Sequence, residues 1–392
     1  MTQVSQAKST AIYPADRAWD RAGNGSPHVG VLVGGPAARA QHIEYSIVFY
    51  LMQGVGSGLA IWWLLTRSTG WVEWSAFITG YLMINFGVGV GYHRYFTHRS
   101  FETTRWMQVV LAVTGQMASM GSIINWVADH RRHHAFANVP GDPYGPKIDG
   151  YGRPQKGLKA FAMSHLGWLH DNTHSCWKIY AKGIADDPVL MFCHRNRYVL
   201  AVVSMIVLPA IWAMIFGGPQ HVIGTILIGG CLRCFLFSNS VAFNNSIAHK
   251  FGYRLFDEKS GATNNWFCAI ISLGDGWHNA HHAAPRIASN KVKWWEFDFN
   301  GSTIHLMERL GLVWNVQRRP RLGAEKQSQH MRKLVPAAAA INHGDNSEYV
   351  LERPTGNGAS RPGGVMFGAS ASEEHIAPAS SPDDADVLLN AS

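Results

Sequence analysis

The chain has 392 residues, of which 47% are hydrophobic and only 15% are charged, and its formal net charge is +8. Soluble domains carry about 25% charged residues, so this composition disfavours a soluble protein and favours a membrane-embedded unit. The positive charge alone is compatible with nucleic-acid binding, but no nucleic-acid-binding motif occurs, and we expect no nucleic-acid partner.

The first 43 residues differ from the apolar middle of the chain. Residues 1–43 mix Pro, Gly and charges of both signs, and they contain no apolar core of the kind that a secretory signal needs. We predict a flexible N-terminal segment in the cytoplasm.

Five stretches further along the chain are uncharged or nearly so. A helix needs about 20 residues to cross a bilayer core of about 30 Å. Unpaired backbone groups are costly in lipid, so crossing segments should be helical. We predict four spans, at Ser46–Leu65, Trp74–Tyr92, Tyr198–Gly218 and His221–Phe243.

The fifth stretch, Trp106–Ala128, is predicted not to cross. It carries polar side chains such as Gln116 and Asn125, which make it less apolar than the other four. It also separates two histidine motifs, and a single crossing would place them on opposite sides of the membrane. We therefore interpret it as a re-entrant or interfacial helix.

Basic residues indicate the orientation of the four spans. Thirteen Lys and Arg lie between His93 and Arg197, whereas the short connections on the opposite side contain only Arg67. Basic residues collect on the cytoplasmic side, so both chain ends and the histidine motifs are predicted to be cytoplasmic. The same charges favour contact with anionic lipid head groups.

The five cysteines suggest no disulfide framework. Cys231 and Cys234 form a Cys-x-x-Cys pair inside an apolar run, where we predict a packing role. Reduced thiols fit a protein that faces the cytoplasm.

Nine of the twenty histidines belong to repeated motifs. Two motifs read His-x-x-His-His, one reads His-x4-His, and one reads Asn-x3-His with Asn245 as its first residue. The nine candidate metal ligands are His93, His98, His130, His133, His134, His249, His278, His281 and His282.

The spacing of these motifs predicts two metal sites. On a helix, residues i and i+4 differ by about 40° in direction, so His130 and His134 could bind one ion. His133 points about 100° away from His134 and faces elsewhere. If two such motifs face each other, each adjacent histidine pair is divided between two ions.

The ligand set favours iron that reacts with O2. Imidazole binds iron, zinc, copper and nickel. Structural zinc sites close with four ligands that usually include Cys, and no Cys lies in these motifs. Soluble di-iron bundles use a Glu-x-x-His signature, which this chain lacks. A membrane metal transporter or storage protein is disfavoured, because transporters place their ligands near the bilayer midplane and these motifs lie outside the apolar runs.

The other histidines are predicted to be structural or at the surface. His165, His170 and His174 are spaced like a ligand helix, but the nine histidines above already fill two sites. The lone histidines are His28, His42, His194, His221, His305, His330, His343 and His375.

From residue 320 onward the composition changes to Ala, Gly, Ser, Pro, Asp and Glu. Such a segment cannot bury enough apolar surface to fold, so residues 320–392 are predicted to be a disordered tail. Residues 44–319 remain as a single membrane domain.

The motifs resemble those of the membrane fatty-acid desaturases, specifically a bacterial form of the stearoyl-CoA (delta-9) type. The likeness extends from about Ser46 to Val316. One departure is Asp275, where the family usually has Glu. The matching motifs are Gly91–Phe101, Asp129–His134, Ser164–Trp168, Asn245–His249 and Gly274–His282.

The resemblance implies an all-α integral membrane fold, with four transmembrane helices under a cytosolic helical cap that holds a histidine-ligated di-iron centre. Asn245 would reach one ion through a water, and Asp129 and Asp275 would orient ligands from the outer shell. One iron (Fe2+/Fe3+) would be held by His93, His98, His130, His134 and His281. The other would be held by His133, His249, His278 and His282.

By the same resemblance, the enzyme would use O2 to insert a cis double bond, at the delta-9 position, into a saturated acyl chain in the bacterial inner membrane. The acyl chain could be carried on CoA, a carrier protein or a phospholipid. A separate electron donor is expected, such as a ferredoxin, a cytochrome or a flavin reductase. The alternatives at the same centre are hydroxylation, acetylenic bond formation and decarboxylation to an alkene.

Overall fold

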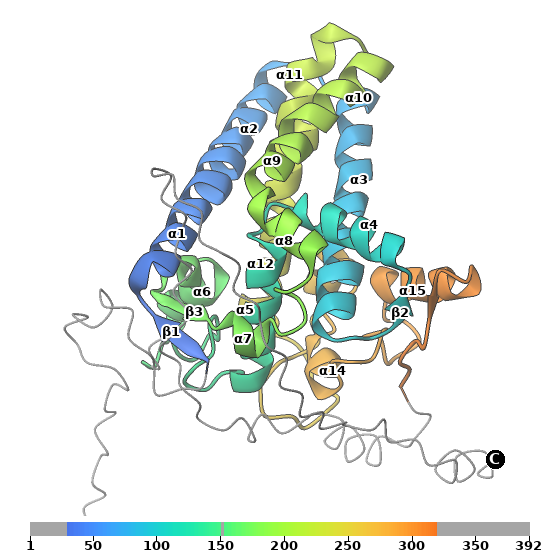
Figure 1. Ribbon diagram of the computed structural model, residues 1–392. Coiled ribbons are helices and arrows are strands. Elements are labelled where there is room, and N and C mark those ends of the chain that lie inside the picture. Colours follow the sequence, from blue (N-terminus) through green and yellow to red (C-terminus); the bar gives the residue numbers. More distant parts are fainter. Residues whose placement is uncertain (1–29, 150–152, 320–392) are drawn as a thin grey trace, which may run out of the picture. The chain divides into compact units, whose positions relative to one another are not determined.

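The structure is a computed structural model that describes residues 30–149 and 153–319. It is mostly helical, and in these ranges the β-structure consists of two short two-stranded sheets and isolated bridges. Four helical stretches are long and apolar enough to cross a membrane, which confirms the predicted number and fits a membrane protein (Figure 1). These spans are Ala38–Thr66, Trp71–Thr97, Arg197–Phe216 and Pro219–Ser246.

Each span is a continuous series of helical segments that includes a π-helical stretch. The first contains α1 (Gly35–Tyr45), η2 (Ser46–Val55) and α2 (Gly56–Thr66). The second contains α3 (Trp71–Asn85) and η3 (Phe86–Thr97). The third contains α9 (Arg197–Val202), η5 (Val203–Val207) and α10 (Leu208–Phe216). The fourth contains η6 (Pro219–His221), α11 (Val222–Thr225), η7 (Ile226–Leu232) and α12 (Arg233–Ser246).

The fourth span packs against the other three, because α2, α3 and η5 all contact η7. Among the four spans, the fourth has the largest share of buried residues in its most apolar part. On the outer faces of the spans, apolar side chains such as Leu51, Leu59 and Ile215 are exposed. Lipid would cover these faces, as expected for helices in a bilayer.

The stretch Trp106–Ala128 forms a helical hairpin rather than one helix. Its arms are α4 (Arg105–Gln116) and α5 (Ile123–Phe136). Helices of 12 and 14 residues are too short to cross about 30 Å at 1.5 Å per residue, which agrees with the re-entrant or interfacial interpretation.

The turn of this hairpin, residues 117–122, is held by polar side chains from two spans. Gln53 Nε2 donates to the carbonyl of Ser119 at 2.9 Å, and Ser204 Oγ donates to the carbonyl of Met117 at 2.6 Å. Irregular backbone at membrane depth is tolerated where protein groups satisfy it, and here they do.

The hairpin and the second span cross at very short range. A Cβ atom on Gly87 of η3 would lie 2.0 Å from the backbone nitrogen of Gly115 of α4. Only glycine fits such a contact. Next to the crossing, Tyr92, Leu111 and Ile124 belong to the largest buried apolar cluster, which joins η3, α4 and α5.

The remaining elements, together with α5, form a cap at one end of the spans (Figure 1). Strand β1 pairs antiparallel with β3, and β2 with β4. The strands are β1 (Val31–Val33), β2 (Glu102–Thr103), β3 (Thr173–Ser175) and β4 (Val313–Trp314). The cap helices are α6 (Gly157–His165), η4 (Gly167–His170), α7 (Trp177–Tyr180), α8 (Pro188–Arg195), α13 (Trp266–Ile271), α14 (His278–Ala283) and α15 (Phe299–Arg309).

Two predictions concern the ends of the chain. Residues 30–43, which the sequence placed in the flexible N-terminal segment, contain β1 and most of α1, so the folded part begins at or before Gly30. Residues 1–29 and the predicted disordered tail 320–392 lie outside the described residues.

All five cysteines are free and buried, as a packing role for Cys231 and Cys234 requires.

Candidate metal centre

Nine histidines meet where the cap joins the second and fourth spans. Four segments bring them together: the end of η3 with the residue after it, the helix α5, the turn after α12, and the helix α14. All are buried except His134, which is half-buried. They are His93, His98, His130, His133, His134, His249, His278, His281 and His282.

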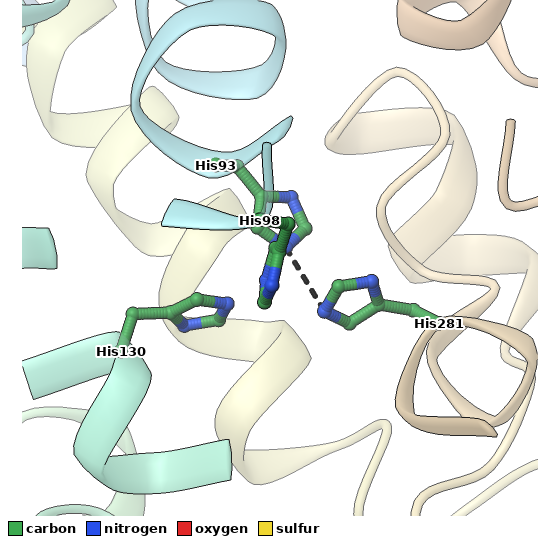
Figure 2. Close-up of side chains that lie close together, drawn as sticks. All are labelled: His93, His98, His130 and His281. Carbon is green, nitrogen blue, oxygen red and sulfur yellow. Dashed lines mark hydrogen bonds between the residues drawn. The ribbon is translucent and has the colours of Figure 1, made fainter. Parts of the chain in front are cut away.

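Eight of these histidines form two groups in which possible ligand atoms lie within 4.8 Å of one another. Figure 2 shows the first group, whose rings point toward a common centre from η3, α5 and α14. The first group is His93, His98, His130 and His281. The second group is His133, His249, His278 and His282.

The shortest contacts in each group join Nε2 atoms. His93 and His281 approach to 3.0 Å in the first group, and His249 and His278 approach to 3.1 Å in the second. Imidazole nitrogens lie about 2.0–2.1 Å from a zinc ion, so two ligands at right angles around a similar ion are about 3 Å apart. The spacing therefore suits ligands that share one ion.

The ninth histidine, His134, lies beside the first group. Its Nε2 atom is 3.2 Å from His130 Nε2 and 3.0 Å from His281 Nε2. Its ring also stacks on His282 of the second group, with centroids 4.4 Å apart. On α5, His130 thus faces the first group and His133 the second, which is the division that the helical spacing predicts.

Several of these imidazoles have a lowered pKa, which favours their neutral form. Burial, reinforced by neighbouring imidazoles, lowers the pKa of His98, His130 and His281 well below the usual value. It lowers the pKa of His278 to about 3. A neutral imidazole offers a nitrogen lone pair, which a metal ligand needs. His98 Nε2 is also buried without a hydrogen-bond partner in the protein.

Local structure fixes the helices that carry these rings. Ser122 caps α5, since its Oγ accepts a hydrogen bond from the Asn125 N–H at 3.2 Å. Arg131 on the same helix donates to the carbonyls of Phe96 at 2.7 Å and Thr97 at 3.3 Å. This guanidinium caps the carbonyl end of η3. It therefore sets the position of two first-group histidines relative to α5.

The two carboxylates singled out in the sequence have different surroundings. Asp275 Oδ1 lies 3.5 Å from His93 Nδ1 and 2.9 Å from Arg94 Nη2. Burial raises the pKa of Asp275, but Arg94 and His93 outweigh burial and leave the pKa below its usual value. Asp129 accepts a hydrogen bond from Ser175 Oγ at 2.7 Å, and burial raises the pKa of Asp129 to about 6. Among the hydrogen bonds of the described residues, none joins Asp129 to a histidine.

Sequence reasoning missed three outer partners in the loop after α5. Asp142, Tyr144 and Asn138 each lie within 3.1 Å of the Nδ1 atom of a clustered histidine. The loop directly follows a His-x-x-His-His motif, and this position was a signal that its polar residues could contact the histidines. The contacts themselves depend on turn geometry that spacing does not reveal.

The histidines predicted to be structural lie outside both groups. His165 links α6 to α12, with Nδ1 3.0 Å from Ser246 Oγ and Nε2 3.1 Å from Asn239 Oδ1. His170 stacks on Tyr50. In residues 30–149 and 153–319 no third cluster of three possible ligands occurs. His28, His330, His343 and His375 lie outside the described residues.

A cavity of about 860 Å³, counted with its open mouth, leads to the histidines. It touches His93, His130 and His278, and Asn245 lies in its wall. Its apolar lining includes Phe49, Val88, Met120, Trp168 and Leu169.

Comparisons with known proteins agree with this geometry. Residues 68–300 match the family described as "Fatty acid desaturase". The chain is 34% identical over 278 residues to hex-5-enoyl-[acyl-carrier protein] acetylenase of Moorena producens (strain JHB), covering 70% of this chain and 86% of the relative. It is 34% identical over 233 residues to sn-1 stearoyl-lipid 9-desaturase of Anabaena variabilis, covering 59% and 78%. It is 33% identical over 290 residues to sn-2 palmitoyl-lipid 9-desaturase of Nostoc sp. (strain 36), covering 71% and 92%.

Proposed function

The chain belongs to the fatty acid desaturase family, and from that premise we propose that it is an O2-dependent desaturase that inserts a cis double bond at the delta-9 position of a saturated acyl chain. Family membership makes the chain an oxidoreductase. The delta-9 position is supported by relatives named stearoyl-lipid and palmitoyl-lipid 9-desaturases.

The observation that carries the proposal is the pair of buried histidine groups beside the cavity, whose lining includes His93, His130 and His278. We assign the first group together with His134 to one iron ion, and the second group to the other, with Asn245 acting through a water. The fit is supported by the converging Nε2 atoms, by the lowered pKa of rings such as His98 and His281, and by the unpaired Nε2 of His98. When bound, two iron ions would activate O2 and supply the oxidant that removes hydrogen from unactivated methylenes.

The chain's own part in the reaction is to hold the acyl group. The apolar lining, including Phe49 and Val88, would bind the chain and exclude water. His93, His130 and His278 border the same space, so methylenes in the cavity would lie beside the metal ligands. A displacement of about an ångström at such a site costs rate and selectivity, so the walls would also set which carbons react.

We assign the cap to the cytoplasmic side of a bacterial inner membrane. An even number of spans places both ends of the membrane unit on one side, and the basic segment between His93 and Arg197 favours the cytoplasm. A separate ferredoxin, cytochrome or flavin reductase would then deliver electrons to the cap. We propose residues 30–319 as the catalytic domain, which extends the predicted 44–319 by β1 and the start of α1, with residues 1–29 and 320–392 as flanking segments.

Acetylenic bond formation is the alternative that a particular observation favours. The Moorena producens relative is named an acetylenase acting on an acyl-carrier protein, and it is as similar to this chain as the Anabaena desaturase is. The same centre could act twice on one carbon pair. Hydroxylation and alkene-forming decarboxylation are further outcomes of the same chemistry.

The test is expression of the full chain in a desaturase-deficient host, followed by double-bond mapping of the lipids by mass spectrometry. We expect a new monounsaturated acyl chain that is absent from cells carrying the His133→Ala variant. A triple bond, a hydroxyl group or a shortened alkene would instead identify one of the alternatives. A transporter or metal-storage role predicts no acyl-dependent O2 uptake by the purified protein, so detecting such uptake eliminates that role.

A further inference from the structure

One short loop contacts ligand histidines of both groups. Residues 138–144 follow α5 directly, and three of their side chains reach Nδ1 atoms on the far side of the rings from the group centres. We propose that this loop is the positioning element of the metal centre, with Asp142 fixing a ligand of the second group and Tyr144 a ligand of the first. The inference rests on the proposed two-metal site.

Asp142 is the strongest of these contacts. Its side chain is fully buried, and its Oδ1 lies 2.8 Å from Nδ1 of His133, which is also fully buried. A carboxylate at this distance keeps the proton on Nδ1 and leaves the Nε2 lone pair free to face the second group. Outer partners of this kind also orient a ligand ring toward its metal ion, and their loss weakens metal binding.

Asp142 organises the loop as well as the histidine. Its Oδ2 accepts the Asn138 N–H at 2.6 Å, and its Oδ1 accepts the Tyr144 N–H at 3.1 Å. One carboxylate thus fixes both ends of the loop and the ring of His133 at once. Replacing it by an amide would weaken each of these hydrogen bonds, because bonds to an ionised acceptor are the stronger ones.

Tyr144 carries the same function to the first group. Its Oη lies 3.0 Å from His130 Nδ1, and its ring stacks on His133 with centroids 4.6 Å apart. A neutral phenol makes a weaker hydrogen bond than a carboxylate, so its effect should be smaller. Asn138 also lies beside a ligand ring, with Nδ2 3.1 Å from His249 Nδ1, and it donates to the Ser260 carbonyl. An amide nitrogen cannot accept a hydrogen bond from Nδ1–H, so this contact does not leave the Nε2 lone pair free as the other two do.

The loop is rigid enough to act in this way. Gly141 has φ +106°, and a Cβ atom there would meet the Phe136 ring at 2.9 Å. Pro140 and Pro143 restrict the backbone on either side. The buried Arg132 of α5 donates from Nε to the Gly141 carbonyl at 2.6 Å. The loop is therefore tied to the helix that carries three of the candidate ligands.

The test counts metal ions rather than product. Full-length protein in detergent is stripped with a chelator and dialysed anaerobically against graded Fe2+, and bound iron is measured by elemental analysis and Mössbauer spectroscopy. For Asp142→Asn we expect about 10–100-fold weaker binding of one of two ions, with the spectrum of that ion altered. For Tyr144→Phe we expect a smaller change, in the other ion. Asp187→Asn is the matched control, because Asp187 pairs with Arg105 and caps α8, and it should bind iron like the unmodified chain.

A double variant separates positioning from folding. If Asp142 acts on the second-group ion through His133, then His133→Ala and His133→Ala/Asp142→Asn bind that ion equally weakly. Further loss of the second-group ion in the double variant would overturn the proposal, as would unchanged binding and spectra in Asp142→Asn. An unmodified chain that binds fewer than two ions would contradict the proposed function itself. If the unmodified chain and Asp142→Asn both bind two ions with equal affinity, the two-metal site stands and only the role of the loop is contradicted.

Discussion

The spans and the cap are built on different principles. In the spans, apolar side chains face outward, and contacts between helices rely on small residues such as Gly87. In the cap, many buried side chains are polar or charged, and Arg132, Asp142 and Asp298 are almost completely enclosed. Packing between apolar surfaces tolerates substitutions of similar volume, whereas a buried polar network depends on every member. On the proposed function, the cap supplies most of the metal ligands and the spans position them.

The largest effect should follow loss of one candidate ligand from either group. We expect His133→Ala and His281→Ala each to abolish product, because each removes an Nε2 atom from one group. The loss should exceed the roughly 10–100-fold that removal of an outer partner costs. Product is measured by lipid analysis, and membrane insertion by fractionation. Near-normal turnover in either variant would show that the ligand assignment is wrong.

Metal removal should affect the cap and spare the spans. A ligand present at about 100 times its Kd stabilises the folded state by about 2.7 kcal/mol. Chelation should therefore abolish turnover and lower hydrogen-exchange protection in α5 and α14, while α2 and α10 stay protected. Fe2+ should restore both properties. Equal loss of protection in spans and cap would break the distinction between the two regions.

A substitution where the second span crosses α4 should be costly even though it touches no histidine. Gly87→Leu would place side-chain atoms into the backbone of α4, where a Cβ atom already meets the Gly115 nitrogen at 2.0 Å. Overpacking typically costs about 1–3 kcal/mol. Gly58→Leu is the matched control, since a Cβ atom at Gly58 meets nothing within 4 Å. Thermal unfolding measures both variants, and equal effects would argue against the close crossing.

The smallest effect is expected for a cap histidine outside the two groups. His165→Ala removes two hydrogen bonds between α6 and α12, each worth about 0.5–1.5 kcal/mol. Thermal stability should fall by that order, while the iron content should stay at that of the unmodified chain. Loss of one ion in this variant would instead show that His165 takes part in metal binding.

The sequence predicted what depends on periodicity. Span number follows from uncharged length, and the division of His130 and His133 between two groups follows from 3.6 residues per turn. The pairing of β1 with β3 was not predictable, because two three-residue strands about 140 positions apart carry no local signal. The contact of Asp142 with His133 depends on a turn with a positive φ angle at Gly141. The cavity is a property of packed side chains, which spacing does not describe.

The turn between α4 and α5 has two sets of neighbours. Gln53 of the first span and Ser204 of the third donate hydrogen bonds to carbonyls of this turn. Met120, which lies in the turn, lines the cavity. A change in the tilt of either span would therefore move a wall of the acyl-binding space. Bilayer thickness influences helix tilt, and unsaturated lipids alter the bilayer. The product of the proposed reaction would change the membrane, and the membrane would in turn change the shape of the cavity through this turn.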